Sequence, residues 1–526
     1  MSAGTFGPPA PRLRLPRWTP RLPSGLGGGA ARVPILLSAA AGLVAIAVYL
    51  GAAVSRVGHP YALEWLEGNS LVEMDRLLGG RPLYAAPTVD YVPDAYPPLY
   101  FAASAGLARV LGVSYLPLRL VSLLAALGCF VLLARLVQRE TGDLAAGVAA
   151  AGLYAATYFA AGTWFDFARV DSLFLAFSLA GLYAARWMRR PRGAMAAGLL
   201  LAAAFLTKQS ALAEAAAITA ALLFGPRRRL GGVLAVTFAA VAGLTTLLWE
   251  VTSHGWYVFY VVELLAQHPL EHSAVTGFWT WYLLPTLGIA LGAALLALRR
   301  TPPVLAMGCL ALAVEGYAGL LHTGGAVNNM LPVYAAVALL AGIGMGGSRA
   351  GGAVAGALVL LQIAVLATTT FAVGQAVPSA AERRVGDRLR AWAAGFDGPV
   401  AVFSDPGLIM AAGLPPVAHR AAVHDVLRGT DRVLRGTDRA ARGELERSIA
   451  RAVAGRRFAA IVVEHPADLD GFPPDLTRYY RPCPERLMAD VPDGAFGPIG
   501  GSPLRPMTLW LPLGRGSCAE AARRLG

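Results

Sequence analysis

The chain has 526 residues, of which 56% are hydrophobic and only 15% are charged, and its mean hydropathy is +0.54. A soluble protein carries about 25% charged residues, so this composition excludes an ordinary soluble enzyme and indicates a membrane protein. The net charge of +13 would suggest nucleic-acid binding in a soluble protein. Here the arginines cluster in short loops between apolar segments and no nucleic-acid-binding motif accompanies them, so we expect no nucleic-acid partner.

The first 32 residues are rich in Pro, Gly and Arg, and we expect them to form a disordered cytoplasmic tail. The apolar run that follows is long enough to cross a bilayer, and the tail is too long for the charged start of a signal peptide. The sequence therefore predicts a retained membrane anchor here.

Eleven apolar segments are predicted to span the membrane, and every second loop between them carries arginines. The predicted spans are 33–54, 117–137, 145–163, 171–187, 193–209, 211–224, 230–252, 277–298, 303–321, 330–347 and 351–374. The arginine clusters are Arg12 to Arg32, Arg135 with Arg139, Arg186 to Arg192, Arg227 to Arg229, Arg299 with Arg300, and Arg349. Short basic loops stay in the cytoplasm. The alternation predicts a multi-pass protein of the bacterial inner membrane, with a cytoplasmic N-terminus and a C-terminal domain outside.

Residues 97–112 (PPLYFAASAGLARVLG) are apolar but only 16 long. Counting them as a span would place Arg135 and Arg139 outside and invert every later loop. We therefore expect an interfacial helix on the outer leaflet, inside a long first outer loop at residues 55–116.

From about residue 375 the chain changes to a small α/β domain that extends to residue 526. The stretches GPVAVFSD and RFAAIVVEHP predict two short buried strands, with a charged helix at about 440–455 between them. VLRGTDR occurs twice in tandem (426–432 and 433–439), which we interpret as a tolerated surface duplication. Cys483 and Cys518 could pair if this domain is extracytoplasmic.

Charged residues gather in the predicted outer loops. The first outer loop contains Glu64, Glu67, Glu73, Asp75, Asp90 and Asp94, and the second contains Asp166, Arg169 and Asp171 in WFDFARVDSLF. Glu64 and Glu67 are three apart, so they would share one face of a helix. An interfacial helix with a solvated acidic face, or a structural Arg–Asp pair in the second loop, would explain the same residues without a reaction.

Further polar residues follow at the outer ends of later spans. Lys208 is the single lysine of the chain and precedes Gln209, which suggests that a compact ammonium is required there. The segment HTGGAVNN adds His322, Asn328 and two glycines whose backbone amides could approach an anion. The spacing of His254, His268 and His272 does not predict a metal site. We expect no cofactor, although the sequence does not exclude a divalent metal.

Carboxylates, cations and amide donors on one face are what transfer from a phosphate-linked donor requires. A carboxylate would deprotonate the acceptor hydroxyl, and cations would stabilise the charge on the leaving phosphate. We therefore expect a membrane transferase for a phosphate-linked donor, in which the interfacial helix and the spanning helices hold a polyprenyl tail.

Several motifs resemble the GT-C superfamily of membrane glycosyltransferases, which includes protein O-mannosyltransferases, the aminoarabinose transferase of lipid A and bacterial oligosaccharyltransferases. The resemblance covers residues 33–340 and rests on the acidic motif after the first span, GGRPLY, YPPLY, RVDSLF and FLTKQSAL. It implies a polyprenyl-phosphate monosaccharide donor, an inverting hexosyl or pentosyl transfer, and a catalytic base in the first outer loop. Metal use varies across the superfamily, so it implies no particular metal.

Within this resemblance the catalytic base is best placed at Glu67, with Glu64 second, although LEG here replaces the usual Asp-Glu pair. Asp171, and less surely Asp166, matches the acidic residue of the second outer loop, and Asp171 would orient the acceptor or Arg169. The residues expected to bind the donor and its phosphate are Arg169, Lys208, Gln209, His322 and Asn328, with Asp94 and Tyr96 as further candidates. The acceptor is an unknown glycan, lipid or protein.

Two other classes of function compete with this prediction. A transporter or lipid flippase would need charged groups near the membrane midplane and repeated halves with broken helices. The sequence has no such repeat, and its charges lie on one face. A non-catalytic membrane scaffold that presents the C-terminal domain would leave the clustered outer charges unexplained.

Overall fold

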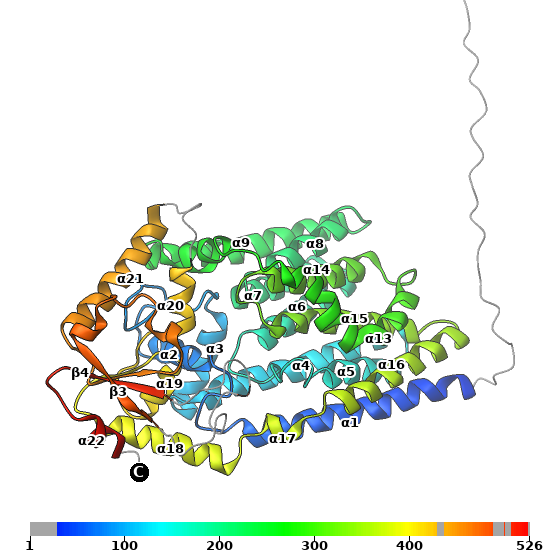
Figure 1. The fold of residues 1–526 in the computed structure, drawn as a ribbon. Coiled ribbons are helices and arrows are strands. Elements are labelled where there is room, and N and C mark those ends of the chain that lie inside the picture. Colours follow the sequence, from blue (N-terminus) through cyan, green and yellow to red (C-terminus); the bar gives the residue numbers. More distant parts are fainter. Residues whose placement is uncertain (1–28, 429–435, 488–498, 500–506, 524–526) are drawn as a thin grey trace, which may run out of the picture.

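The computed structural model describes residues 29–428, 436–487, 499 and 507–523, and these form a long helical bundle with a small sheet domain at one end (Figure 1). The bundle starts with α1 (Val33–Arg56), whose first residues lie at the end far from the sheet. Residues 1–28 of the N-terminal tail and residues 429–435 of the duplicated VLRGTDR segment lie outside the described residues.

A helix lies at each of the eleven predicted spans. After α1 these are α4 (Tyr115–Thr141), α5 (Leu144–Ala156), α6 (Asp171–Trp187), α7 (Pro191–Thr207), α8 (Ala211–Leu223), α9 (Arg228–Thr252), α13 (Leu284–Ala297), α14 (Pro303–Leu321), α15 (Met330–Met345) and α16 (Arg349–Thr369). Seven helical segments among the described residues are long and apolar enough to cross a membrane. The protein is therefore a multi-pass membrane protein, as predicted.

Two spans differ in detail from the prediction. Helix α5 ends at Ala156 and not at residue 163, because the chain turns there into an aromatic-rich loop that packs Phe165 and Phe167 into the core. The span predicted at 277–298 begins earlier, with α12 (Ser273–Gly277) and the π-helix η3 (Phe278–Leu283) leading into α13. Outside these places the predicted ends fall within a few residues of the observed ones.

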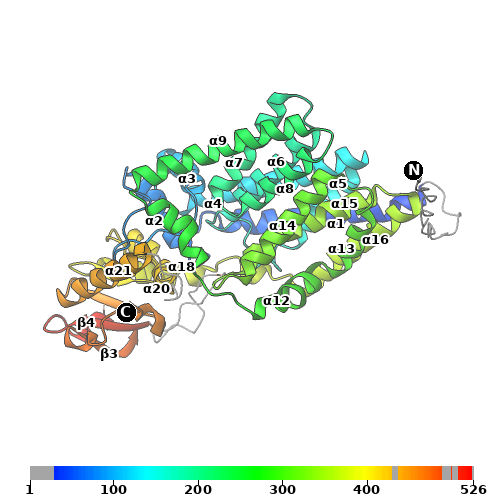
Figure 2. The same cartoon turned by 90° about the horizontal axis from the view of Figure 1, so that it is seen from above.

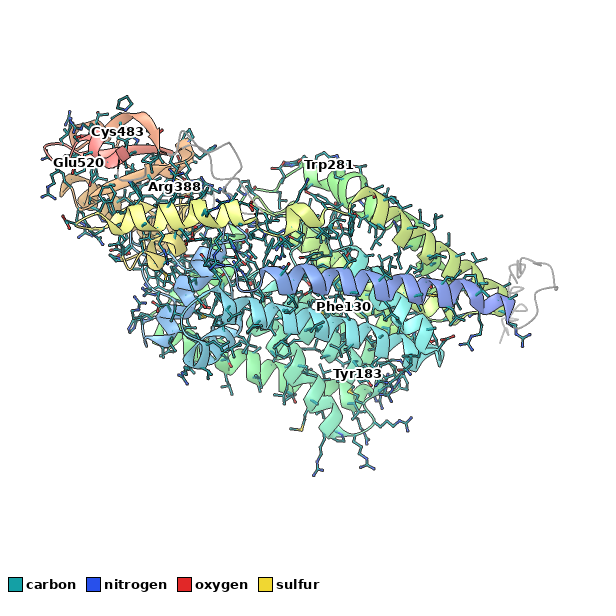
Figure 3. All side chains as sticks on the ribbon, turned by 90° about the horizontal axis from the view of Figure 1, so that it is seen from below. Phe130, Tyr183, Trp281, Arg388, Cys483 and Glu520 are labelled. Carbon is teal, nitrogen blue, oxygen red and sulfur yellow. A yellow bond between two sulfur atoms is a disulfide. The ribbon has the colours of Figure 1, made fainter. Side chains whose placement is uncertain are left out.

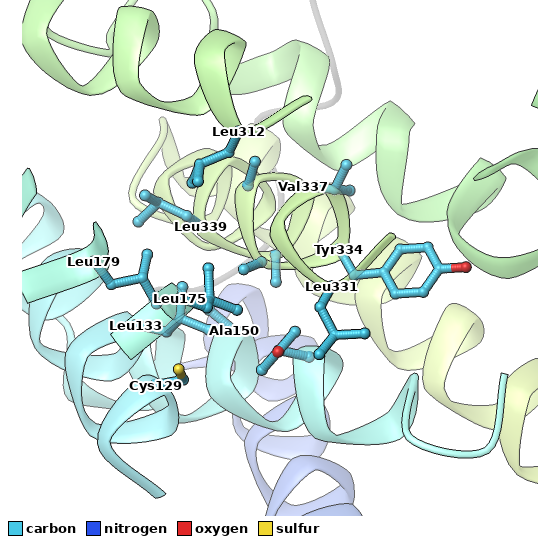
Figure 4. Packing of buried hydrophobic residues seen from close by; sticks show 14 of the residues in the cluster. Cys129, Leu133, Ala150, Leu175, Leu179, Leu312, Leu331, Tyr334, Val337 and Leu339 are labelled. Atoms are coloured by element: carbon cyan, nitrogen blue, oxygen red, sulfur yellow. The ribbon is translucent and has the colours of Figure 1, made fainter. Parts of the chain in front are cut away.

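Small residues let the spanning helices approach closely. Gly42 of α1 lies against Gly152 of α5, where a Cβ on Gly152 would come within 2.0 Å of the Gly42 Cα. Close backbone contact of this kind is the usual way in which helices associate inside lipid. Helix α15 is buried over most of its surface and packs Leu331 and Leu339 against the helices around it (Figure 4). It forms the centre of the bundle.

The segment between α1 and α4 (residues 57–114, loop 1) contains α2 (Glu67–Leu78) and α3 (Leu99–Leu111). Helix α3 has 13 residues and packs against α2, α4 and α7. It lies within the predicted 97–112 segment. Helix α2 begins at Glu67, so the expectation that Glu64 and Glu67 share a helix face is wrong.

The C-terminal domain is α/β, as predicted. It contains α18 (Ala380–Ala394), β1 (Val400–Val402), α19 (Pro406–Ala411), α20 (Arg420–Leu427), α21 (Gly436–Ala454), β2 (Ala460–Val463), β3 (Tyr480–Leu487), β4 (Met507–Pro512) and α22 (Cys518–Arg523). The sheet order is β1-β2-β4-β3, with β1 and β2 parallel and the other pairs antiparallel. Strands β1 and β2 lie in the two predicted stretches, whereas β3 and β4 were not anticipated.

A disulfide joins Cys483 of β3 to Cys518 of α22. It holds the last helix against the sheet, and Figure 3 shows Cys483 beside Glu520 at the tip of this domain. The sequence left this pairing open.

The C-terminal domain packs directly on loop 1 (Figure 2). The Ala418 amide donates to the Val89 carbonyl over 2.9 Å, and Arg457 forms a bidentate ion pair with Asp90. The Tyr61 hydroxyl donates to Asp387 over 2.7 Å. These contacts place the domain over the end of the bundle at which loop 1 lies, so that both border the same cavity.

Candidate functional site

A cavity of about 630 Å³ lies at this end of the bundle, enclosed by four parts of the chain. Its walls are loop 1, the segment between α5 and α6 (residues 157–170, loop 2), the outer ends of α7, α8 and α14 with the turn after α14, and α20. Its polar lining residues are Asp94, Tyr96, Arg169, Lys208, Gln209, Ser210, Glu315, His322, Asn328, Asn329, Asp425 and Arg428.

Seven residues singled out from the sequence line this one cavity. They are Asp94, Tyr96, Arg169, Lys208, Gln209, His322 and Asn328. They come from four separate parts of the chain, so only the fold brings them together. Asp171 lies directly behind Lys208, and Glu64 lies directly behind Arg169, whereas Glu67 and Asp166 are paired elsewhere.

Glu67 is completely buried and lies outside the cavity lining. Arg119 of α4 donates to both of its carboxylate oxygens, over 3.1 and 2.5 Å, and the amides of Leu63 and Ala168 each donate over 2.6 Å. Burial opposes its ionisation, but Arg119 and the amides outweigh burial and lower the pKa of Glu67. This carboxylate connects loop 1, loop 2 and α4, and it is not placed to accept a proton from a substrate.

Glu64 precedes α2 and faces Arg169 of loop 2, with 3.9 Å between Glu64 Oε2 and Arg169 Nε. The Leu66 amide donates to the same oxygen over 3.1 Å, while Oε1 has no hydrogen-bond partner in the described part of the chain. Burial raises the pKa of Glu64 to about 8, although Arg169 opposes this shift. Such a carboxyl changes its protonation state near neutral pH.

Asp94 lines the cavity close to the same arginine. Asn69 donates to its Oδ1 over 2.7 Å, and its amide donates to Glu73 over 2.7 Å, whereas no described residue hydrogen-bonds to Oδ2. Burial raises the pKa of Asp94, with Arg169 acting in the opposite direction. Asp94 therefore offers a free carboxylate oxygen at the cavity wall.

Arg169 donates through Nη2 to the Tyr96 hydroxyl over 3.1 Å. Its Nε and Nη1 atoms are buried and have no hydrogen-bond partner among the residues that the structure describes. Nε lies toward Glu64, which leaves Nη1 as an unused donor of a residue that lines the cavity. A guanidinium in this position is suited to bind an anion such as phosphate.

Lys208 ends α7 and has three polar neighbours. Its Nζ lies 3.1 Å from Asp171 Oδ1, 3.2 Å from Asn329 Oδ1 and 3.9 Å from Glu315 Oε1. Asn328 donates to the same Asp171 oxygen over 3.0 Å. Asp171 thus holds Lys208 and Asn328 at the cavity wall. From the sequence we expected Asp171 to orient Arg169 or the acceptor instead.

Asp166 forms a buried ion pair that stabilises the fold. Both of its oxygens accept hydrogen bonds from Arg56, over 2.7 and 2.8 Å, and the Tyr158 hydroxyl donates to it over 3.1 Å. Both partners of the ion pair are almost completely buried away from the cavity. The pair connects the end of α1 to loop 2.

Gln209 and His322 line the cavity, as expected, but neither side chain is positively charged. Gln209 donates to the carbonyls of Ala95 and Val261, which leaves its Oε1 as an acceptor toward the cavity. His322 Nε2–H donates to the Leu265 carbonyl over 3.1 Å, and burial lowers the pKa of this imidazole. His322 is therefore neutral near pH 7 and offers no positive charge to a phosphate.

The glycines of HTGGAVNN have a structural role. The Gly325 amide donates to the His322 carbonyl over 2.8 Å, so it is not available to an anion. A Cβ on Gly325 would lie 2.2 Å from the Gly319 carbonyl oxygen, and Gly324 has a φ of +91°. Glycine is required here because the turn packs tightly against the end of α14.

Helix α20 forms a wall that sequence reasoning did not anticipate. Asp425 and Arg428 line the cavity, and the Asp425 carbonyl accepts a hydrogen bond from His268 over 3.0 Å. Burial raises the pKa of Asp425 to about 7, although Arg428 lowers it. Asp425 lies in α20, and Arg428 directly follows this helix. Arg428 belongs to the VLRGTDR duplication, which we interpreted as a tolerated surface feature, so neither residue was expected at the site.

His419 fixes α20 to loop 1. Its Nε2–H donates to the carbonyls of Trp65, over 2.8 Å, and Ser404, over 3.1 Å, while its Nδ1 accepts from the Ala421 amide. The last contact caps the start of the helix. Only the neutral imidazole with a hydrogen on Nε2 can make all three bonds.

At its deeper end the cavity reaches the lipid-facing surface of the bundle. Ala213 of α8 and Val314 of α14 line it and are both exposed. These two residues lie about one and two helical turns below the polar outer ends of their helices. Among the described residues, no group of three or more His, Cys, Asp or Glu is placed to hold a metal ion.

Residues 95–256 match the family described as dolichyl-phosphate-mannose-protein mannosyltransferases. The fold resembles that of ArnT from Cupriavidus metallidurans bound to undecaprenyl phosphate, with a TM-score of 0.55, 14% identity, and coverage of 89% of this chain and 96% of that chain. The apo state of that protein gives a TM-score of 0.54, at 14% identity over 89% and 97% of the two chains.

The archaeal oligosaccharyltransferase AglB from Archaeoglobus fulgidus, in complex with an inhibitory peptide and a dolichol-phosphate, is also similar, with a TM-score of 0.51 and 12% identity over 83% of this chain and 72% of that chain. No curated protein matches the sequence. The chain therefore has an ArnT-like fold, and the resemblance to the GT-C superfamily is confirmed.

Proposed function

We propose that this protein transfers a monosaccharide from a polyprenyl-phosphate-linked donor to an acceptor hydroxyl at the outer face of the bacterial inner membrane. The observation that carries the proposal is the cavity itself. It has carboxylates and the three cations Arg169, Lys208 and Arg428 at its polar end, and the exposed residues Ala213 of α8 and Val314 of α14 at its deeper end. A lipid-linked phosphosugar likewise has a polar sugar phosphate at one end and an apolar prenyl chain at the other, so its two ends match the two ends of the cavity.

In this proposal the donor phosphate binds between Arg169 and Lys208. Arg169, whose Nη1 has no hydrogen-bond partner among the described residues, and the ammonium of Lys208 supply the positive charge on this part of the cavity wall. The prenyl chain leaves past Ala213 and Val314 into the bilayer. The match of residues 95–256 to the mannosyltransferase family and the lipid phosphates held by the two similar proteins support this assignment.

The acceptor hydroxyl loses its proton to a carboxylate while its oxygen forms a bond to the anomeric carbon. The bond from that carbon to the phosphate oxygen breaks, and its electron pair stays on the phosphate, which Arg169 and Lys208 stabilise. A single displacement of this kind inverts the anomeric configuration. The sugar is a hexose or pentose.

We assign the base to Asp94 or Glu64 in place of Glu67. Asp94 is supported by access, since its free Oδ2 lies at the cavity wall. Glu64 is supported by its ionisation, since a pKa of about 8 suits a base that works near neutral pH. Glu67 is fully occupied by Arg119 and two amides.

In this proposal the acceptor binds next to helix α20. Asp425 and Arg428 face the donor-binding residues across the cavity and come from the C-terminal domain. An acceptor must therefore enter along that domain, whether it is a glycan, a lipid or a protein.

We also propose that the N-terminus is cytoplasmic and that the C-terminal domain is extracytoplasmic. The alternating arginine loops support this orientation. The disulfide between Cys483 and Cys518 supports it independently, because disulfides persist in the periplasm and not in the cytoplasm.

The test is release of labelled sugar from a panel of polyprenyl-phosphate monosaccharides by the purified full-length protein in detergent. We expect one donor to be consumed, and consumption to require Lys208. Lys208→Met should weaken donor use at least 100-fold, and Lys208→Arg should not restore it, because the planar guanidinium does not fit between Asp171 and Asn329. If no donor is hydrolysed or transferred with any acceptor fraction, the proposal is wrong.

A further inference from the structure

Glu315 lies at the deep end of the cavity, and the mechanism above does not use it. It belongs to α14, and its side chain is 4% exposed. The Ser210 hydroxyl donates to Glu315 Oε1 over 2.7 Å, whereas Oε2 has no hydrogen-bond partner among the described residues. A buried carboxyl with one unused oxygen at a cavity wall is costly unless a ligand satisfies it.

Few charges surround Glu315. The packed elements contribute Lys208 from the α7–α8 junction, Asp171 from α6, Glu214 from α8 and His322 from the end of α14. Lys208 is the single cation of this set near neutral pH, and it lies closer to Asp171 (3.1 Å) than to Glu315 (3.9 Å). Two carboxyl groups thus share one ammonium.

The position of Glu315 along the cavity points to the phosphate. Glu315 lies between Lys208, on the outer side, and the lipid-exposed Val314 and Ala213, where the prenyl chain would leave. The sugar lies on the other side of Lys208, toward Asp94. The group of the donor that meets Glu315 is therefore the phosphate and not the sugar.

A charged carboxylate at this place would repel the phosphate that Lys208 attracts, and the low dielectric of the site strengthens that repulsion. A neutral carboxyl removes the repulsion and adds a donor. The hydrogen bond from Ser210 to Oε1 leaves Oε1 as the carbonyl oxygen and Oε2 as the hydroxyl oxygen of the acid.

We propose that Glu315 is a phosphate-binding residue that acts as a neutral carboxylic acid, with its Oε2 hydroxyl donating a hydrogen bond to the donor phosphate beside Lys208. This inference rests on the proposed function and names a second element of its phosphate site. When the sugar–oxygen bond breaks and the phosphate gains negative charge, the same hydrogen bond becomes stronger.

The test measures binding of methyl undecaprenyl phosphate to the full-length protein in lipid nanodiscs between pH 5.5 and 9.0. This phosphodiester has no second ionisation in that range and carries no sugar, so the pH dependence belongs to the protein and the contact belongs to the phosphate. The variants are Glu315→Gln, which is neutral and keeps a donor, and Glu315→Ala, which removes the donor. Asp425→Asn is the matched control, because it neutralises a cavity carboxyl on the opposite wall.

At pH 5.5 we expect wild type and Glu315→Gln to bind within threefold of each other and Glu315→Ala to bind at least fivefold more weakly. As the pH rises to 9.0, the wild type should weaken at least tenfold relative to Glu315→Gln, because one proton must be retained on Glu315. Asp425→Asn should keep this decline.

A wild-type to Glu315→Gln affinity ratio that stays constant with pH would overturn the inference, as would equal binding by the Ala and Gln variants. In both cases the proposed function would stand, because the wild type still binds the lipid phosphate. If the folded wild type binds the phosphodiester at no pH, the proposed function fails and this inference fails with it.

Discussion

Glu67 and Arg119 form an ion pair with no exposed surface on either side chain, with 2.5 Å between Glu67 Oε2 and Arg119 Nη2. Arg119 also donates to the carbonyls of His59 and Tyr61 over 2.6 Å each. The pair joins the segment after α1, the start of α2 and the first turns of α4 through one guanidinium. Its position gives Glu67 a structural role in the acidic motif after the first span, whereas the proposed role of base belongs to Asp94 or Glu64.

We expect Glu67→Gln to destabilise the protein by about 3 kcal/mol, because removal of one partner leaves Arg119 buried without a counter-charge. The measurement is the melting temperature of the purified protein in detergent, with Glu64→Gln as the matched control. The double variant Glu67→Gln with Arg119→Met should recover part of the loss. If the Glu67→Gln protein has the wild-type melting temperature but no transferase activity, Glu67 is the base and the structural role is wrong.

We expect Asp94→Asn or Glu64→Gln to lower kcat at least about 100-fold with little change in melting temperature, because loss of a general base removes a rate factor of about 10² to 10⁴. The pH profile separates the two. If Glu64 is the base, kcat/KM should rise with pH and level off above about 8, since the carboxyl must be deprotonated to act and its pKa is about 8. Full activity in both variants would exclude this site for the base.

Docking of α20 on loop 1 should weaken in acid because of His419. Burial, together with Arg420, lowers the pKa of His419 to about 3, whereas a free histidine has a pKa of about 6.5. The undocked form therefore binds more protons between these values. The stabilisation is complete above about pH 6.5 and is lost as the pH falls toward 3, at up to about 1.4 kcal/mol per pH unit.

Hydrogen exchange in residues 420–427 at pH 7.0 and pH 5.0 measures this effect, with intrinsic rates corrected for pH. Protection should fall at the lower pH in the wild type, and His419→Gln should have low protection at both. His424→Gln in the same helix is the control and should keep the wild-type pH dependence. Equal protection at both pH values in the wild type would contradict the assignment.

Cys483 and Cys518 should be oxidised in protein isolated from its native membrane. The bond closes a loop with a sequence separation of 35 residues, so Cys483→Ser should cost about 3 to 4 kcal/mol of domain stability. Maleimide labelling of denatured protein should modify two cysteines, Cys129 and Cys309, before reduction and four after it. Labelling of all four before reduction would place the domain in a reducing compartment.

Most of the fold could be predicted from local patterns. Apolar runs separated by arginine loops gave the positions of eleven helices, because each spanning segment must satisfy its backbone internally and each must be apolar by itself. The 97–112 segment contains a helix, α3, as expected, whereas the expectation that it does not cross the membrane stays a prediction. Strands β3 and β4 were missed, since β3 (YRPCPERL) contains two prolines and several charges and has no alternating apolar pattern.

The candidate site could be predicted only in part. Lys208, Arg169 and Asn328 were found because charged or polar residues at the ends of apolar segments are rare. Asp425, Arg428 and Glu315 were not found, because the first two lie in and directly after an ordinary charged helix and the third is a single acid inside an apolar run. These three residues reach the cavity only because α20 and α14 pack around it in the folded protein.

The sequence by itself determined that the chain crosses the membrane many times, where its apolar helices lie, and that polar residues gather at one end, because hydropathy and charge act on each segment independently. Only the tertiary structure decided that Glu67 is held by Arg119 while Glu64 and Asp94 face Arg169, and that α20 closes the cavity. These distinctions depend on distances of a few ångströms between residues far apart in the chain. A carboxylate becomes a structural ion-pair partner or a reactive group according to the donors that surround it.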